Sequence, residues 1–220
     1  MIFLPISLAV FIILILLLPL IIILLQVGIV SFAFSKLGLS PAAGVMLFLL
    51  SLLGSAINIP VMRRKVIVEE DITSFNLFRS IFGIRIPHVT EQIIAVNVGG
   101  ALIPTALALY VLPRAPFGAT IIATLIVTIV AYFLSRPISG VGIALPAFIP
   151  PIVSALVAIA IAPENAPQVA YFSGVIGTLL GADILKLGKM KALGPCFMSI
   201  GGAGVYDGIY LVGILSVILA

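Results

Sequence analysis

The sequence predicts an all-α fold: a polytopic membrane bundle of about seven transmembrane helices in a single domain over residues 1–220. Three observations support this prediction. The chain is 63% hydrophobic and 8% charged, whereas soluble domains carry about 25% charged residues. Apolar runs of roughly 18 residues or more recur along the chain, and each is long enough to cross a bilayer. Proline and glycine interrupt several of these runs, which predicts broken helices.

The expected spans are separated by loops of very unequal charge. We expect spans at about 2–25, 41–59, 93–112, 117–134, 139–162, 168–187 and 197–219. The second, fourth and sixth loops hold nine of the 11 lysines and arginines, and the first, third and fifth hold the other two. Because cytoplasmic loops are enriched in these residues, the pattern predicts a multi-pass cell-membrane protein with its N-terminus in the cytoplasm and its C-terminus outside.

The first run, residues 2–25, is expected to remain as a helix that is kinked or capped near Pro19. Its apolar core is too long for a cleavable signal peptide, and it lacks a basic flank and a small-residue cleavage site. The loop at about 61–92 is expected to be cytoplasmic because of its basic residues. It is also expected to contain an amphipathic helix, because Phe75, Phe78 and Phe82 follow helical spacing. Such a helix could lie on the membrane surface or pack on the ends of the bundle.

Helix breakers lie deep within the third and fifth expected spans. The sequence reads "NVGGALIP" over residues 97–104 and "LPAFIPP" over residues 145–151. Carbonyl groups freed by such breaks are tolerated at membrane depth only against protein or a water-filled cavity. Two interpretations stay open: a central hydrophilic cavity lined by broken helices, or kinked helices in a tight bundle.

Two of the seven acidic residues fall inside expected spans, Asp183 and Asp207. An aspartate at the centre of a bilayer costs about 2.5–3.5 kcal/mol on insertion scales, so such residues usually face the protein interior and serve a function. Asp183 lies about one turn from Lys186, so it could also pair with that lysine or reach the interface. Asp207 lies about midway along the last span, with no basic residue nearby.

The last two spans are expected to form a hairpin that brings both aspartates together on the cytoplasmic half of the bilayer. Small residues near them would let neighbouring helices approach closely; they are Ser173, Gly177 and Gly181 in one span and Gly201, Gly204 and Gly208 in the other. Two carboxylates in a low-dielectric site share a proton. One ionised and one protonated carboxyl group can activate water and polarise a carbonyl, and proton-coupled carriers use the same state.

Short motifs in this chain resemble those of intramembrane aspartic peptidases, the presenilin, signal peptide peptidase and prepilin peptidase group. Tyr206–Asp207 matches the Tyr-Asp motif of that group, although the motif order is reversed relative to presenilins. The residues before Asp183 resemble Gly-x-Gly-Asp with both glycines replaced, and Ala144–Pro146 resembles part of Pro-Ala-Leu. Over most of its length the sequence also resembles a family of uncharacterised prokaryotic membrane proteins.

The resemblance implies an intramembrane aspartic protease that hydrolyses peptide bonds of a transmembrane peptide or membrane-protein substrate within the lipid bilayer. Asp183 and Asp207 would be catalytic, and the substrate-binding residues would be Gly181, Gly204, Tyr206, Leu145 and Pro146. A proton- or cation-coupled transporter is the alternative, because broken helices near an acidic residue are the usual binding-site architecture of carriers. A noncatalytic scaffold is a third interpretation. We expect no cofactor, metal or nucleic-acid partner, and the oligomeric state stays open.

Overall fold

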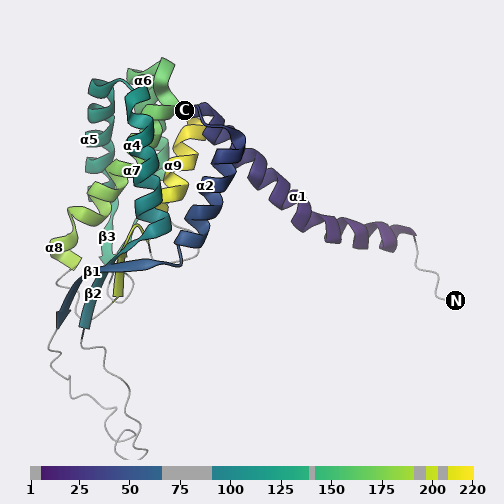
Figure 1. Ribbon diagram of the computed structural model, residues 1–220, viewed down its shortest axis with the longest axis horizontal. Coiled ribbons are helices and arrows are strands. Elements are labelled where there is room, and N and C mark those ends of the chain that lie inside the picture. Colours follow the sequence, from purple (N-terminus) through teal and green to yellow (C-terminus); the bar gives the residue numbers. More distant parts are fainter. Residues whose placement is uncertain (1–5, 66–90, 139–141, 191–196, 203–207) are drawn as a thin grey trace, which may run out of the picture.

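The computed structural model describes residues 6–65, 91–138, 142–190, 197–202 and 208–220 (Figure 1). Its apolar helices lie side by side in a bundle, and short strands gather at one end. We refer to the end that carries the strands as the foot. The opposite end, where the first helix stops at Lys36 and the chain ends at Ala220, is the head. The amphipathic helix predicted at 75–82 lies outside the described residues.

The first helix, α1, spans Ile6–Lys36 and therefore continues well beyond the predicted end near residue 25. Pro19 lies inside it rather than at a boundary. The N-terminal part extends away from the bundle (Figure 1), and its side chains are exposed from residue 17 to residue 29. The last turns pack into the bundle through Phe34 and Leu37.

In several of the later helices proline lies at the beginning and does not break the helix. Proline lies in the first turn of α2, α4, α6 and α7, where the backbone N–H has no intrahelical partner to lose. The α-helices after α1 are α2 Pro41–Gly54, α4 Ile103–Val111, α5 Phe117–Leu134, α6 Ile149–Ile161, α7 Ala166–Thr178, α8 Leu187–Met190 and α9 Gly208–Leu219. Two π-helices, η1 Val98–Leu102 and η4 Leu179–Ile184, precede α4 and follow α7, and η2 Leu112–Arg114 and η3 Pro163–Asn165 are short 3₁₀ turns.

The all-α prediction is wrong at the foot, where the mostly helical chain forms two small sheets. The larger sheet has the order β1 (Asn58–Lys65), β2 (Glu91–Asn97), β5 (Phe197–Ile200). β1 and β2 are antiparallel, whereas β2 and β5 are parallel. The smaller sheet pairs β3 (Arg136–Ile138) with β4 (Gly142–Ala144). The third, fifth and seventh expected spans therefore each contain a strand before their helix.

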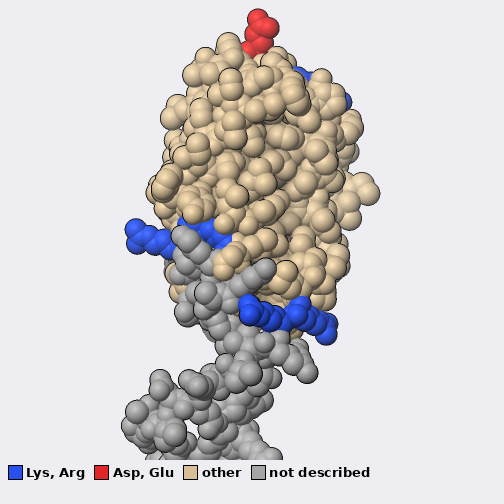
Figure 2. Space-filling model, turned by 90° about the vertical axis from the view of Figure 1, so that its left-hand side faces the viewer, with Lys and Arg blue, Asp and Glu red and all other residues tan. Residues whose placement is uncertain are grey.

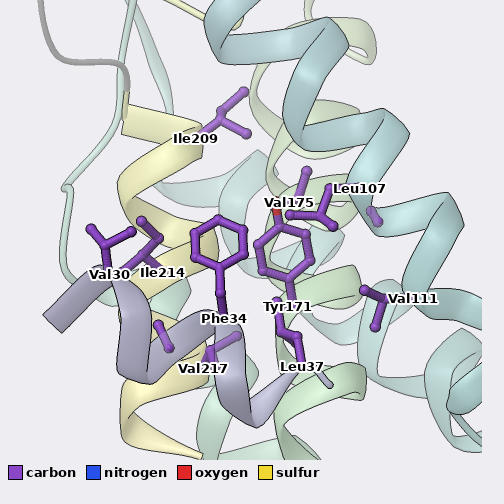
Figure 3. Packing of buried hydrophobic residues seen from close by; sticks show 12 residues of the cluster. Val30, Phe34, Leu37, Leu107, Val111, Tyr171, Val175, Ile209, Ile214 and Val217 are labelled. Carbon is purple, nitrogen blue, oxygen red and sulfur yellow. The ribbon is translucent and has the colours of Figure 1, made fainter. Parts of the chain in front are cut away.

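Inside the bundle the helices meet through small side chains, and large apolar side chains point outward. On α5 the buried positions include Ala123, Val127 and Ala131, whereas Leu125 and Phe133 are exposed, Phe133 by 76%. α7 is the central helix, in contact with α4, α5, α6 and α9. Larger residues fill the space between α1, α4, α7 and α9, in a cluster that contains Phe34 and Tyr171 (Figure 3).

Two described helical segments are long and apolar enough to cross a membrane, Leu17–Lys36 and Phe117–Leu134. Only 17% and 22% of the respective apolar windows are buried, whereas the core helix of a soluble protein would be mostly buried. Length and composition are the basis of this assignment, and the other apolar helices, such as α2 and α6, are shorter. Soluble monomers rarely expose contiguous apolar surface on this scale.

The backbones of α2 and η1 are in close contact at Gly54 and Gly99. A Cβ atom added to Gly99 would lie 1.9 Å from the carbonyl oxygen of Ser51, and one added to Gly54 would lie 3.0 Å from the backbone nitrogen of Gly99. The Ser51 hydroxyl donates to the Gly99 carbonyl at 2.5 Å. Only glycine fits at residue 99, because the neighbouring atoms are backbone and cannot rotate away.

We predict that Gly99→Ala destabilises the bundle, by about 1–3 kcal/mol or more, because overpacking must displace backbone. Gly118→Ala is the matched control, since a Cβ atom there meets nothing within 4 Å; it should leave stability unchanged or raise it by up to about 1 kcal/mol. Thermal unfolding in detergent measures both. Equal midpoints for the two variants would show that α2 and η1 do not touch in this way.

Candidate functional site

Asp183 is buried near the foot, on the π-helix that continues α7. Its Oδ2 atom accepts a hydrogen bond from the backbone N–H of Gly201 at 2.9 Å. Gly201 directly follows β5 and has φ +87°, and Gly202 has φ +100°. Glycine adopts these left-handed conformations without steric cost. The carboxylate is thereby joined to the segment that leads from β5 toward α9.

Gly201 also fixes where β5 ends against η1. A Cβ atom added to Gly201 would lie 2.6 Å from Cβ of Ala101 and 2.8 Å from its backbone nitrogen. The end of β5 therefore lies between two π-helices, with η4 on one side through Asp183 and η1 on the other through Ala101. The sequence suggested close approach at Gly201 but did not identify its partners.

A network of polar side chains surrounds the adjoining strand ends. Asn97 caps η1, because its Oδ1 atom accepts the N–H of Gly100 at 2.8 Å. Its Nδ2 group donates to the carbonyl of Ser55 at 2.7 Å and to Oδ1 of Asn58 at 3.1 Å. The Ser199 hydroxyl donates to the same Asn58 oxygen at 2.6 Å. Sequence reasoning marked this asparagine as part of a helix break, and the structure places it at the junction of β1, β2 and β5.

Lys186 is buried three residues after Asp183 and contacts the end of α5. Its ammonium group donates to the carbonyl of Ser135 and lies 4.9 Å from the ring centroid of Tyr132. The sequence left open whether Asp183 pairs with Lys186 or reaches the membrane interface. The hydrogen bond described for Asp183 comes from a backbone N–H, and the lysine attaches the turn after η4 to the α5–β3 corner. A Lys186–Asp183 pair stays a prediction.

The predicted Leu-Pro break lies at the same end of the bundle. Ile143, on β4, packs against a buried cluster formed by Ile94, Met198 and Ile200. Two residues further along, Leu145 is half-buried and Pro146 is exposed, between β4 and α6. The structure thus brings the chain before Leu145 and Pro146 next to β5, the strand whose end holds Asp183.

Gly181 lies on the side of η4 that faces α5. A Cβ atom there would lie 2.3 Å from the carbonyl oxygen of Thr128 and 2.9 Å from Cβ of Ala131. Its visible role is close helix packing, and a role in substrate binding stays a prediction. One α-helical turn earlier, Gly177 makes a similar approach to Val127.

Gly204, Tyr206 and Asp207 lie outside the described residues. Asp207 immediately precedes Gly208, the first residue of α9, and α9 packs on α7 and contacts η1. A direct contact with Asp183 stays a prediction. Across the described segments, no group of three or more His, Cys, Asp or Glu residues could hold a metal ion.

The sequence matches a family described as "Protein of unknown function (DUF1614)" over residues 52–219. The chain belongs to this family. The match begins near the end of α2 and extends to the last residue of α9, so it includes the strands, both π-helices and the two aspartates. No curated protein and no solved structure matches the chain. The chemistry of this DUF1614 protein must therefore be inferred from its own residues.

We predict that Asp183→Asn and Asp183→Ala differ in stability. The carboxamide oxygen of asparagine can still accept the Gly201 N–H, whereas alanine leaves that buried N–H without its acceptor, which costs about 1–3 kcal/mol. Thermal unfolding should place Asp183→Asn near the wild type and Asp183→Ala clearly below it. Glu164→Ala, at an exposed acidic residue of the head, should shift stability by less than about 0.5 kcal/mol. Equal stability of the two Asp183 variants would argue against the Gly201 hydrogen bond.

Proposed function

We propose that this protein is a seven-span membrane protein whose foot faces the cytoplasm. The distribution of charge supports this orientation. Arg63 and Arg64 on β1 and Arg136 on β3 are exposed at the foot, whereas the head exposes one arginine, Arg114, and one acidic residue, Glu164. Figure 2 shows charged side chains at the two ends of the bundle and an uncharged body between them. Cytoplasmic ends of membrane proteins are enriched in lysine and arginine.

Strands at the foot can complete spans whose helices are short. α9 has 12 residues, which is about 18 Å of helix. The four residues of β5 add about 13 Å of extended chain, and together these lengths approach the roughly 30 Å of a hydrocarbon core. Non-helical backbone is tolerated at this depth where protein covers it: one edge of β5 pairs with β2, and Met198 and Ile200 are buried.

We further propose that the protein is an intramembrane aspartic protease in which Asp183 and Asp207 act as a pair. The observation that carries this proposal is the hydrogen bond between Gly201 and Asp183. It holds the first carboxyl group against the segment that leads to the second. A buried carboxylate in an apolar bundle is costly, which favours a functional role for it.

In the proposed reaction the two carboxyl groups share one proton. The ionised group removes a proton from water as the water oxygen attacks the carbonyl carbon of a peptide bond. The protonated group donates a hydrogen bond to the carbonyl oxygen, on which negative charge develops. When the tetrahedral intermediate collapses, the C–N bond breaks and the amine leaves with a proton taken from the carboxyl pair.

The substrate would approach from the Leu145–Pro146 side of the foot. A transmembrane helix must unwind before its carbonyl groups can be attacked, and an unwound segment needs hydrogen-bonding partners. The irregular residues 145–148 follow β4, which contacts β5, and could receive it. Gly204 and Tyr206, next to Asp207 in the sequence, are also proposed to bind substrate.

A proton- or cation-coupled transporter is the second candidate, and one observation favours it. Two parallel strands, β2 and β5, lie side by side. In the sequence Gly-Gly-Ala follows β5 directly, at residues 201–203, and follows β2 after Val98, at residues 99–101. Paired, interrupted segments with polar groups at the break are typical of transporter binding sites. The Asn58–Asn97–Ser199 network lies at this position.

Cleavage of model transmembrane peptides by the reconstituted protein tests the proposed reaction. The wild type should cleave them, and Asp183→Asn and Asp207→Asn should each abolish cleavage while the protein stays folded. The double variant should be little worse than either single one, because groups that act as a unit are strongly non-additive. Glu164→Gln, at the head, should retain activity. Full cleavage by Asp207→Asn would end the aspartic-pair hypothesis. Proton-driven uptake without any cleavage, lost in Asp183→Asn, would support the transporter instead.

Cysteine labelling tests the orientation. In a Cys196→Ser background, Glu164→Cys should react with a membrane-impermeant maleimide in intact cells, and Arg136→Cys only in inverted vesicles. Both native side chains are exposed, so a failure to react reports the membrane barrier rather than burial. The reverse labelling pattern would invert the topology and place Asp183 on the outer side.

A further inference from the structure

Two separate segments pass from exposed apolar to exposed basic side chains at the foot. Along β1, Ile59 and Val61 are exposed, and Arg63 and Arg64 follow them. At the end of α5, Phe133 is exposed and Arg136 follows three residues later, on β3. Such a change over two to four residues, repeated at one end of an apolar bundle, is typical of the boundary between hydrocarbon and lipid headgroups.

The arginines at the foot differ from the basic residues at the head in what they contact. At the head, the Lys36 ammonium donates to the carbonyls of Val217 and Ile218, both at 3.3 Å, in the last turn of α9. The Arg114 guanidinium lies 4.7 Å from the ring centroid of Tyr110 and donates to its hydroxyl at 3.1 Å. Both cations therefore have partners within the protein.

At the foot, the guanidinium groups of Arg63, Arg64 and Arg136 are exposed and have no hydrogen bond or ion pair within the described part of the chain. Asp183 is buried there and accepts a hydrogen bond from Gly201. Glu91, the first residue of β2, is in register with Lys65 of β1. Among the charged side chains of the foot whose burial is described, the exposed ones are these three arginines, in line with the basic side chains at the lower end of the bundle in Figure 2.

We propose that the foot binds anionic phospholipid headgroups through Arg63, Arg64 and Arg136. The proposal rests on the membrane insertion proposed above, but not on the protease reaction. A guanidinium group donates two parallel hydrogen bonds to a phosphate, a geometry that suits Arg better than Lys. The exposed side chains of Val61 and Phe133 would contact the acyl chains of the same lipids.

The spacing of the arginines favours lipids over a single bound phosphate. Adjacent residues of a strand point to opposite faces, so Arg63 and Arg64 project to the two sides of β1 and cannot close around one anion. Arg136 comes from a different sheet. Three separated cations, next to exposed apolar side chains, suit several headgroups arranged in a plane.

Lipid selectivity can be measured by electron paramagnetic resonance with spin-labelled lipids on the full-length protein reconstituted in phosphatidylcholine. The fraction of motionally restricted label gives the association of phosphatidylglycerol relative to phosphatidylcholine. The wild type should prefer phosphatidylglycerol by about fivefold or more, and each Arg→Gln substitution at the foot should remove up to about fivefold. Raising the salt concentration should weaken the preference, because exposed charges are screened.

The controls separate charge at the foot from charge in general. Arg114→Gln, at the head, should leave the preference unchanged, and Arg136→Lys should retain most of it. Arg136→Gln alone keeps the test valid if the triple variant does not fold. A wild type that inserts but shows no preference overturns the proposal and leaves membrane insertion intact. A full preference in the Arg63→Gln/Arg64→Gln/Arg136→Gln variant also overturns it, whether or not the protein cleaves peptides.

Discussion

The arrangement of the foot follows from one constraint: backbone groups released at the end of a helix need partners when water is scarce. The described helices near the foot meet this need in three ways. β2 pairs with β1 on one side and with β5 on the other. Asn97 caps η1, and the Ser51 hydroxyl donates to the Gly99 carbonyl. Asp183 accepts the N–H of Gly201. The candidate catalytic carboxylate of Asp183 is thus also the hydrogen-bond acceptor of a backbone N–H group.

The proposed membrane environment also accounts for helices that meet through glycine, alanine and serine. Lipid is as apolar as a leucine side chain, so helices in a membrane gain little from hiding apolar surface and associate through close packing instead. At Gly174 a Cβ atom would lie 3.1 Å from the Ser154 hydroxyl and 3.2 Å from the Ser216 hydroxyl. Each serine donates to a carbonyl three residues earlier on its own helix. At this contact the helices approach closely while both serine hydroxyls keep an acceptor, and large side chains such as Leu156 remain exposed.

The sequence predicted an element correctly where an uninterrupted apolar run forms one helix, and it failed where the chain changes from strand to helix. Residues 117–134 were predicted as a span and form α5, because no breaker interrupts them. The strands were missed because short apolar runs such as residues 93–96 suit a buried helix and a buried strand equally well. The cost of an acid within a span drew attention to Asp183, which is buried, and its catalytic role stays a prediction. Its partner was not predictable, because a backbone N–H at a left-handed glycine carries no chemical signature in the sequence. Residues 203–207 hold the second predicted carboxylate, and the fold leaves its pairing as a prediction.

Gly201 offers a way to locate function that does not depend on which reaction is correct. It contacts both π-helices of the described chain, η4 through Asp183 and η1 through Ala101. π-Helical turns are rare and occur frequently at functional sites. Strained backbone conformations persist only where the surrounding structure holds them in place. Two such turns meeting at one strand end, beside a polar network and a buried carboxylate, are difficult to explain as packing alone. A protease would use this junction to position the carboxyl pair, and a carrier would use it to bind a cation or proton. Both place the chemistry at the end of β5.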